Sequence, residues 1–446
     1  MSTLNKTYPS VAVRVALLKK LKTQIKKQEK EICEALAKDL GKPTFESMLT
    51  ETQFVLAELR HTIKHLRGWA VPKRIPGSML NFPAKEYIYQ HPYGRVLIFA
   101  PWNYPFQLTL APLIGAVAAG NSVVLKPSEM APNTGAVIKD ILTKVFDIKF
   151  VTVIEGGPLL AKELLKQQWD YIFYTGSTAI GKEIYQAAAK NLTPVTLELG
   201  GKSPCIVHES ASLKVAAKRI AWGKFVNTGQ TCVAPDFVLV HESVKQQFTQ
   251  YLISAIKDLY GENPEENTDY GKIINKKHFQ RLIGYLEGTK ISHGGTSNET
   301  SLYIAPTVVD NPSLQSAVMS EEIFGPILPI ISYTYEKDLD TILKKYEHSL
   351  ALYVFANNKE FTNAIIENYA FGGGCINDTL VHLVNNQLPF GGIGNSGIGK
   401  YHGKYSFDTF SHSKAIVKRS KLENPLRYAP YKKKTKLIKL LYRFIN

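Results

Sequence analysis

The sequence has few cysteines and no long apolar run. Four cysteines are spread over 446 residues, and no two of them form a Cys-x-x-Cys pair. This excludes a disulfide scaffold, a zinc ribbon and a thioredoxin-type motif, and we expect no metal site. No apolar run reaches the roughly 18 residues of a membrane span, and the N-terminus MSTLNKTYPS lacks the apolar core of a secretory signal. We therefore expect a protein of the reducing cytoplasm.

The sequence also lacks tandem repeats, and its excess of positive charge is local. Lys and Arg number 54 against 38 Asp and Glu, which gives a net charge of +16. The segment from Lys414 to the C-terminus holds eleven of these cations and a single acid, Glu423. A nucleic-acid-binding surface would spread its basic residues differently, so we expect no nucleic-acid partner. The apolar fraction of 44% is that of a globular protein and excludes a disordered chain.

The first part of the chain, residues 10–67, has the apolar spacing of helices. Apolar residues recur three and four positions apart from Val11 to Ile25. A second helix is expected after Pro43, and it should end near Gly68 because prolines follow.

From residue 86 onward, short apolar runs mark strands. Two strands, 86–90 and 95–100, flank the turn signal His-Pro-Tyr-Gly. Further strands are expected at 122–125, 150–154, 171–174 and 195–197, alternating with helices at 105–119, 133–145, 159–167 and 179–189. Such alternation predicts a parallel sheet buried on both faces, typical of a nucleotide-binding α/β domain.

The same alternation returns at wider spacing between residues 210 and 400. Strands are expected at 237–240, 305–309, 327–331 and 352–355, and helices at 243–259 and 359–369. This part of the chain therefore predicts a second α/β domain.

One candidate phosphate site lies where a predicted strand leads into a helix. The turn consists of Gly176, Ser177, Thr178, Ala179, Ile180 and Gly181. A helix N-terminus offers free N–H groups and the positive end of the helix dipole to a phosphate. The spacing departs from the Rossmann fingerprint, so a plain tight turn is an equal interpretation. Lys126 and Glu129 follow another strand, where they can hold ribose hydroxyls or form an exposed turn.

Three further residues carry groups suited to covalent catalysis. Cys232 closes the stretch N-T-G-Q-T-C, and a thiolate is a strong nucleophile when nearby dipoles lower its pKa, although an isolated cysteine is more often a buried apolar residue. Glu198 lies among apolar neighbours at a strand end, where burial suits a general base; an exposed position is the alternative. Asn103 follows a strand, and its amide suits either an oxyanion or a helix N-cap. The cysteines interpreted as packing residues are Cys33, Cys205 and Cys375.

Together and in order, these motifs resemble the aldehyde dehydrogenase superfamily over residues 10–425. The matching stretches are P-W-N at 101–103, K-P-S-E at 126–129, T-G-S at 175–177, E-L-G-G-K at 198–202, N-x-G-Q-x-C at 227–232, E-E-I-F-G-P at 321–326 and L-P-F-G-G-I-G-N-S-G at 388–397. The stretch 399–412 and the short N-terminal part resemble class 3, which includes fatty, aromatic and coniferyl aldehyde dehydrogenases and uses NAD or NADP.

The resemblance implies a fold of class α/β with three structural parts. A Rossmann-like NAD(P)-binding domain is expected from residues 1–80 and 101–206, and an α/β catalytic domain from 207–400. A small β oligomerisation element is expected from 81–100 and 401–425, followed by a basic amphipathic tail at 426–446. The same resemblance implies a homodimer.

The resemblance also assigns catalytic roles. Cys232 would attack the aldehyde carbon, and the Asn103 amide with the Cys232 N–H would hold the oxyanion. Glu198 would activate the water that releases the carboxylic acid; CoA-acylating relatives generally lack this base. There are two alternatives to dehydrogenase activity. One is thiol esterase activity, and the other is a membrane- or nucleic-acid-binding role on an enzyme scaffold that has lost its activity.

For the cofactor, the resemblance places Glu322 on the nicotinamide ribose with Phe324 packed beside it. Lys126 and Glu129 would hold the adenine ribose, and the turn 176–181 the pyrophosphate. Glu129 would repel the 2′-phosphate of NADP if its side chain were rigid, but a mobile carboxylate could swing away. The preference between NAD and NADP is therefore left open.

The tail gives the last expectation. Leu437, Leu440, Leu441 and Phe444 recur on one helical face while lysines fall off it. A basic amphipathic helix of this kind lies at a membrane surface and cannot span it. Peripheral membrane contact and a medium- or long-chain aldehyde are therefore expected. The alternatives are a solvated tail, or a helix docked on the partner subunit.

Overall fold

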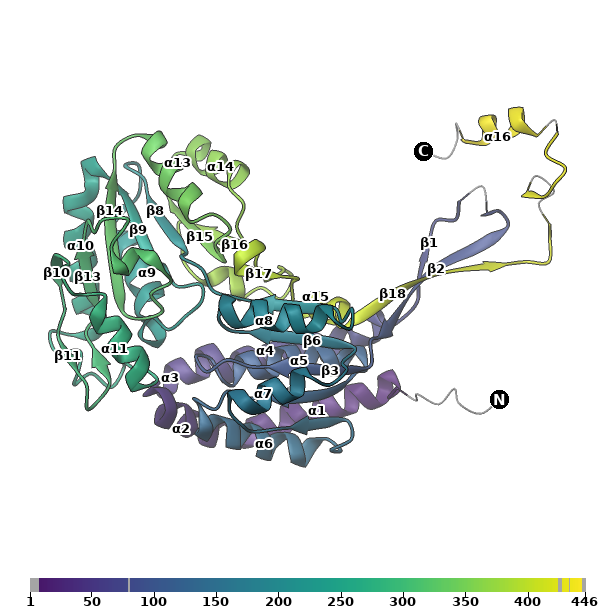
Figure 1. Cartoon of the computed structure of the whole chain (residues 1–446), viewed down its shortest axis with the longest axis horizontal. Coiled ribbons are helices and arrows are strands. Elements are labelled where there is room, and N and C mark those ends of the chain that lie inside the picture. The colour runs from purple at the N-terminus through teal and green to yellow at the C-terminus, as the bar shows by residue number, and fades with distance from the viewer. Residues whose placement is uncertain (1–7, 79–80, 424–426, 433, 443–446) are drawn as a thin grey trace.

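The computed structural model describes residues 8–78, 81–423, 427–432 and 434–442. Two α/β halves lie side by side, and a narrow arm of strands projects from them (Figure 1).

The chain begins with helical segments whose apolar faces turn inward. They are α1 (Val11–Lys27), α2 (Glu29–Leu40), α3 (Thr44–Ser47), the π-helical η1 (Met48–Thr52) and α4 (Gln53–Trp69). The predicted stripe is buried, since Leu18, Leu21 and Ile25 have no exposed surface. The structure adds a break at Gln28 and a left-handed Gly41 (φ 64°) that ends α2.

The first half is built on a six-stranded sheet of order β17-β7-β6-β3-β4-β5. Its strands are β3 (Arg95–Phe99), β4 (Ser122–Lys126), β5 (Val151–Val153), β6 (Tyr171–Thr175), β7 (Val195–Glu198) and β17 (Gly397–Ile398). Its helices are α5 (Gln107–Ala119), α6 (Pro132–Val145), α7 (Pro158–Leu165), α8 (Thr178–Ala189) and α15 (Gly403–Thr409). All pairs are parallel except β17 with β7. The strand order reverses between β3 and β6, and ligands bind at such a switch point in open α/β sheets.

The second half has a seven-stranded sheet of order β10-β13-β14-β9-β8-β15-β16. Its strands are β8 (Pro204–Val207), β9 (Phe237–His241), β10 (Ile291–His293), β13 (Thr307–Asp310), β14 (Ile327–Tyr333), β15 (Ala351–Phe355) and β16 (Gly373–Ile376). The helices are α9 (Leu213–Phe225), α10 (Glu242–Tyr260), α11 (Lys276–Gly284), α12 (Ala317–Ser320), α13 (Glu336–Lys345) and α14 (Lys359–Asn368). Short elements complete it: η3 (Val226–Gly229), β11 (Ser297–Asn298), β12 (Tyr303–Ile304) and η4 (Val381–Leu383). A further short element, η5 (Gly394–Ser396), directly precedes β17 of the first sheet. The predicted second α/β domain is therefore present.

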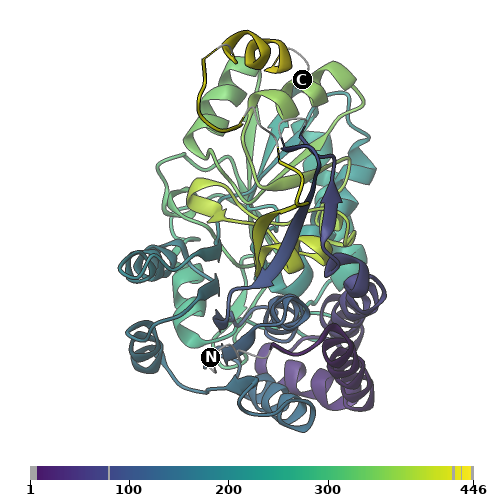
Figure 2. The ribbon, with the colours of Figure 1, turned by 90° about the vertical axis from the view of Figure 1, so that its right-hand side faces the viewer.

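The arm is a three-stranded antiparallel sheet of order β1-β2-β18. Its strands are β1 (Lys73–Ile75), β2 (Ala84–Pro92) and β18 (Ser411–Arg419). Beyond it the chain reaches α16 (Thr435–Tyr442), which Figures 1 and 2 show far from the N-terminal helices.

The sheets divide the chain differently from the expected domain boundaries in four places. Residues 95–99 were expected in the oligomerisation element, but they form β3 at the centre of the first sheet. Residues 403–409, assigned to the same element, form α15, which packs on α4 and α5. Residues 397–398 were expected in the catalytic domain but pair with β7. Residues 73–75 were expected in the NAD(P)-binding domain but join the arm as β1. The turn signal between β2 and β3 thus separates two sheets.

Part of the predicted tail helix is seen. In α16, Leu437 and Leu440 are 43% and 49% exposed. Phe444, the last member of the predicted apolar face, lies outside the described residues, and so does the side chain of Leu441. Among the described residues, no helix is both long enough and apolar enough to cross a bilayer.

Candidate active site

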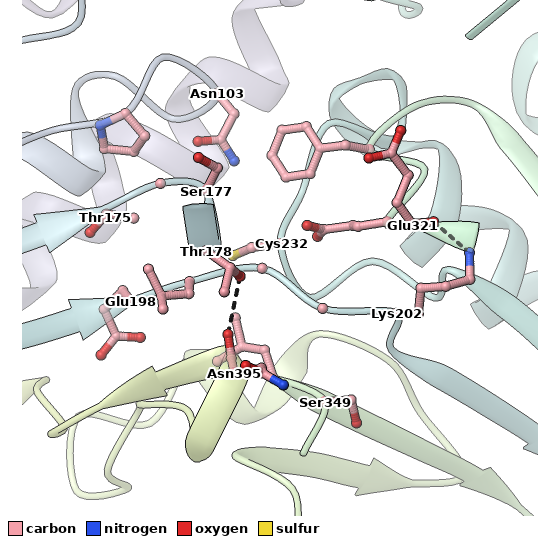
Figure 3. A pocket seen from close by; sticks show the side chains of 18 of the residues that line it. Asn103, Thr175, Ser177, Thr178, Glu198, Lys202, Cys232, Glu321, Ser349 and Asn395 are labelled. Carbon is pink, nitrogen blue, oxygen red and sulfur yellow. Dashed lines mark hydrogen bonds between the residues drawn. The ribbon is translucent and has the colours of Figure 1, made fainter. Parts of the chain in front are cut away.

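A cavity of about 630 Å³ lies where the two sheets meet. The first sheet contributes the carboxyl ends of adjacent strands: Asn103 follows β3, Gly176 follows β6, and Glu198 ends β7. The second sheet contributes segments before its strands: Cys232 precedes β9, and Glu322 precedes β14. Figure 3 shows the labelled Asn103 and Cys232 near one another, with the Glu198 carboxylate turned away from Cys232. A cavity of this size is typical of a binding site for a small ligand or cofactor.

Cys232 is the one cysteine of the chain that lines this cavity. Burial raises the pKa of its thiol, and the nearby carboxylates of Glu322 and Glu198 raise it further. The backbone N–H groups of Cys232 and Val233 are oriented to the sulfur and lower the same pKa. In this state the sulfur keeps its proton, and it lies against two N–H groups that can stabilise negative charge.

Asn103 is held beside the cysteine segment by amide hydrogen bonds. Its side-chain Nδ2 donates to the Gln230 carbonyl oxygen (3.0 Å). Its main-chain carbonyl oxygen accepts from Asn227 Nδ2 (2.8 Å). Asn103 is only 3% exposed. An N-cap role was the alternative for Asn103, but α5 begins at Gln107 with Phe106 as its cap residue. The amide is thus fixed near Cys232, with a second N–H to offer.

Glu198 is buried, with 3% of its surface exposed. Neither carboxylate oxygen has a hydrogen-bond partner among the described residues. Desolvation raises the pKa of Glu198 well above its ordinary value. A buried carboxyl without a partner is costly, and a carboxyl with a raised pKa on a residue that lines a cavity is a candidate general base.

Glu322 and Phe324 lie across the cavity from α8, on the segment before β14. Desolvation raises the pKa of Glu322 to about 8, while the Gly201 N–H lowers it. The ring of Phe324 packs edge-on against Trp102, with centroids 5.3 Å apart. The segment thereby contacts the loop that carries Asn103.

The turn before α8 has the features expected of a phosphate cradle. Ser177 is the N-cap of a twelve-residue helix, and its Oγ accepts from the Ile180 N–H. Gly176, Ser177, Thr178 and Ala179 line the cavity, whereas Ile180 and Gly181 do not. A Cβ at Gly181 would overlap Leu199, so this glycine permits close packing of the helix on the sheet.

A dinucleotide fits these surroundings. The cavity offers a helix N-terminus for a pyrophosphate and a carboxylate for a ribose. A Cβ at Gly200 would overlap the Glu322 carboxylate, so only glycine lets this carboxylate lie so close to the backbone. Lys126 and Glu129 lie outside the cavity lining, where their side chains form a 2.8 Å ion pair.

Several residues of the site were not singled out from the sequence. Lys202 and Arg281 line the cavity beside Glu322, and Asn227 holds the backbone of Asn103. Lys202 and Asn227 lie inside two of the motifs, so a signal existed for them. Arg281 lies in no motif, and only the packing of α11 brings it to the cavity.

Known proteins resemble this chain over most of its length. The family model described as "Aldehyde dehydrogenase family" matches residues 7–416. The 4,4'-diaponeurosporen-aldehyde dehydrogenase of Staphylococcus aureus is 48% identical, over 97% of this chain and 95% of that protein. The "Aldehyde dehydrogenase, dimeric NADP-preferring" of Rattus norvegicus is 46% identical, over 95% and 93%. Among solved structures, "Substrate bound state of Staphylococcus Aureus AldH" matches with a TM-score of 0.96 and 47% identity, over 98% and 96% of the chains.

Proposed function

Because the chain belongs to the aldehyde dehydrogenase family and is of the class 3 type, we propose that it oxidises an apolar aldehyde to its acid, with Cys232, Glu198 and Asn103 as its catalytic residues. The enzyme uses NAD(P). The observation that carries the proposal is the meeting of a thiol, an unpartnered buried carboxyl and a fixed amide in one cavity.

The first step is attack of the Cys232 sulfur on the aldehyde carbon. The thiol passes its proton to a water molecule as the carbon–sulfur bond forms, and the carbonyl oxygen becomes an oxyanion. The Asn103 amide and the Cys232 N–H stabilise that oxyanion, because both are held before the reaction begins. The product of this step is a thiohemiacetal on Cys232.

The thiohemiacetal is then oxidised to a thioester. NAD(P), when bound, supplies the two-electron acceptor for this oxidation. Glu198 takes a proton from water, which attacks the thioester carbon and releases the carboxylic acid and the thiol. A raised pKa makes Glu198 a stronger base when it is ionised.

The cofactor contacts are part of the same proposal. Glu322 holds the nicotinamide ribose with Phe324 beside it, and Lys126 with Glu129 holds the adenine ribose. The first turn of α8 receives the pyrophosphate on its free N–H groups.

For the substrate we favour a medium- or long-chain aliphatic aldehyde over an aromatic one. Apolar side chains supply much of the cavity wall, among them Trp102, Leu108 and Phe390. One relative acts, by its name, on diaponeurosporen-aldehyde. The test is kcat/KM, followed by formation of the reduced nicotinamide, across short, long-chain and aromatic aldehydes with each cofactor. A preference for short polar aldehydes would contradict the assignment.

The remaining proposals concern assembly and location. A homodimer is supported by the free edge of β18 and by the name of the rat relative. Peripheral membrane binding is supported by exposed Leu437 and Leu440 beside Lys436 and Lys439 in α16. Co-sedimentation with anionic vesicles at low and high salt tests this, comparing the full chain with a version ending at Pro430. Equal pelleting of both versions would contradict the anchor.

A further inference from the structure

We propose that Lys202, Asp236 and Arg281 form a clamp on the main chain of residues 321–323 and thereby position Glu322 toward the cofactor. The clamp rests on the proposed role of Glu322 and adds three positioning residues to it. None of the three needs to touch the cofactor to act in this way.

Lys202 holds the segment from one side. Its Nζ donates to the carbonyl oxygens of Val318 (3.0 Å) and Glu321 (2.9 Å), the second of which is visible in Figure 3. The same Nζ pairs with Asp236 Oδ2 at 2.5 Å, and the two side chains are 4% and 5% exposed. Its ammonium therefore has all three donors in use, and all of them fix the surroundings of Glu322.

Asp236 and Arg281 hold the next residues. The Ile323 N–H donates to Asp236 Oδ1 (3.0 Å). Arg281 donates to the carbonyl oxygens of Glu322 (3.2 Å) and Ile323 (2.8 Å). Arg281 is itself oriented by Tyr285, whose hydroxyl accepts from it at 2.8 Å. Three consecutive residues of the segment are thus bound through backbone atoms, so none of these bonds uses the Glu322 carboxylate.

The segment needs such support because its backbone is strained. Phe324 has a φ of 52°, in the left-handed region that a bulky side chain rarely adopts. The Gly325 carbonyl lies so close to Gly229 that a Cβ there would overlap it. Gly229 precedes Cys232 by three residues, so the clamped segment lies directly against the nucleophile loop.

Charge adds a second effect of the clamp. Lys202 and Arg281 both lower the pKa of Glu322, which desolvation and Asp236 raise. The two cations thus favour the ionised carboxylate that accepts hydrogen bonds from ribose hydroxyls.

The test uses Arg281→Gln, because the Arg281 side chain is 27% exposed and its loss should leave the fold intact. Loss of two charge-assisted hydrogen bonds should raise the dissociation constant of NAD by about ten-fold. Binding is measured by calorimetry without aldehyde, with the melting temperature and the KM values of cofactor and aldehyde alongside. We expect a raised cofactor KM, and an aldehyde KM and melting temperature close to those of the unmodified protein. Lys202→Arg should retain tighter binding than Lys202→Met.

The matched control is Arg219→Gln. Arg219 also donates to a main-chain carbonyl, that of Asn377, but it lies outside the cavity lining. It should leave NAD binding unchanged. If it weakens binding as much as Arg281→Gln does, the effect is general and the clamp is wrong.

A double variant separates the clamp from the role of Glu322. If Arg281 acts through Glu322, then Arg281→Gln combined with Glu322→Gln should bind NAD no more weakly than Glu322→Gln alone. Additive losses would overturn the clamp. Weak binding by Glu322→Gln with normal binding by Arg281→Gln would overturn the clamp and keep the proposed function. Normal binding by Glu322→Gln would overturn the role of Glu322 and, with it, the clamp.

Discussion

Lys42 and Glu51 form an ion pair of 2.6 Å in which both side chains are fully buried. The other Glu51 oxygen accepts from the N–H groups of Phe106 (3.0 Å) and Gln107 (2.8 Å), at the start of α5. Lys42 also donates to the Asn103 carbonyl oxygen at 3.3 Å. The pair therefore joins the N-terminal helices to the loop that carries the proposed oxyanion donor.

Breaking this pair should be costly. Lys42→Met would leave the Glu51 carboxylate buried without its cation, which lowers the free energy of unfolding by about 3–5 kcal/mol. Denaturant titration measures the loss. Lys42→Met combined with Glu51→Gln should recover much of it, because the glutamine oxygen can still accept from α5. A loss below about 1 kcal/mol in the single variant, the usual range of exposed pairs, would contradict the prediction.

Cys232→Ala should abolish aldehyde oxidation while NAD still binds, because the variant lacks only the nucleophile. The activity is followed by the absorbance of the reduced nicotinamide, and binding by calorimetry. Cys375→Ala is the matched control, since Cys375 lies outside the cavity lining, and it should stay active. Turnover by the Cys232 variant near that of the unmodified enzyme would refute the assignment.

Glu198→Gln should form the thioester but release acid slowly. We expect a burst of reduced nicotinamide close to one equivalent per site, and an acyl adduct on Cys232 by mass spectrometry. In the unmodified enzyme, acid release requires the ionised carboxylate. Because burial raises the pKa of Glu198, that step should slow as the pH falls through this raised pKa, well above the usual range of a glutamate. Steady turnover without a burst in the variant would contradict the role.

Glu129→Gln should shift the cofactor preference toward NADP. Glu129 pairs with Lys126 at 2.8 Å, so removal of its charge leaves the Lys126 ammonium for a 2′-phosphate. We expect the ratio of kcat/KM for NADP over NAD to rise by about ten-fold, which corresponds to about 1.4 kcal/mol. An unchanged ratio would show that the pair does not face the adenine ribose.

Ile416→Asp with Val417→Asp should convert the proposed dimer to monomers. Both residues lie on β18, the edge strand of the arm, and are 38% and 48% exposed. Charged side chains at such an edge oppose the approach of a second chain. Light scattering at micromolar concentration gives the mass. A dimer that persists would place the interface elsewhere.

The regular elements could be predicted from the sequence because their signals are local. The strand β4 was expected at 122–125 and spans Ser122–Lys126; the helix α14 was expected at 359–369 and spans Lys359–Asn368. Short apolar runs and helical spacing depend only on neighbouring residues.

The assembly of the site could not be predicted in the same way. No local sequence signal shows that the carboxyl edge of one sheet meets the amino edge of the other. That meeting is what brings Glu198 and Cys232 to one cavity. Arg281 reaches the cavity through packing alone. A turn signal was predicted between β2 and β3, but the two strands do not pair with each other: β2 pairs with β1 and β18, and β3 pairs with β4 and β6.

The pairing of β2 with β18 sets an order of events during synthesis. Gln90 and Ser413 lie 323 residues apart and become neighbours in the arm. On the ribosome, β2 emerges early and waits for its partner until nearly the whole chain has been made, while both α/β halves can already collapse. The arm is therefore completed late in synthesis. Contacts between residues so far apart in sequence close slowly, so dimerisation through the arm, as proposed above, would follow completion of the chain.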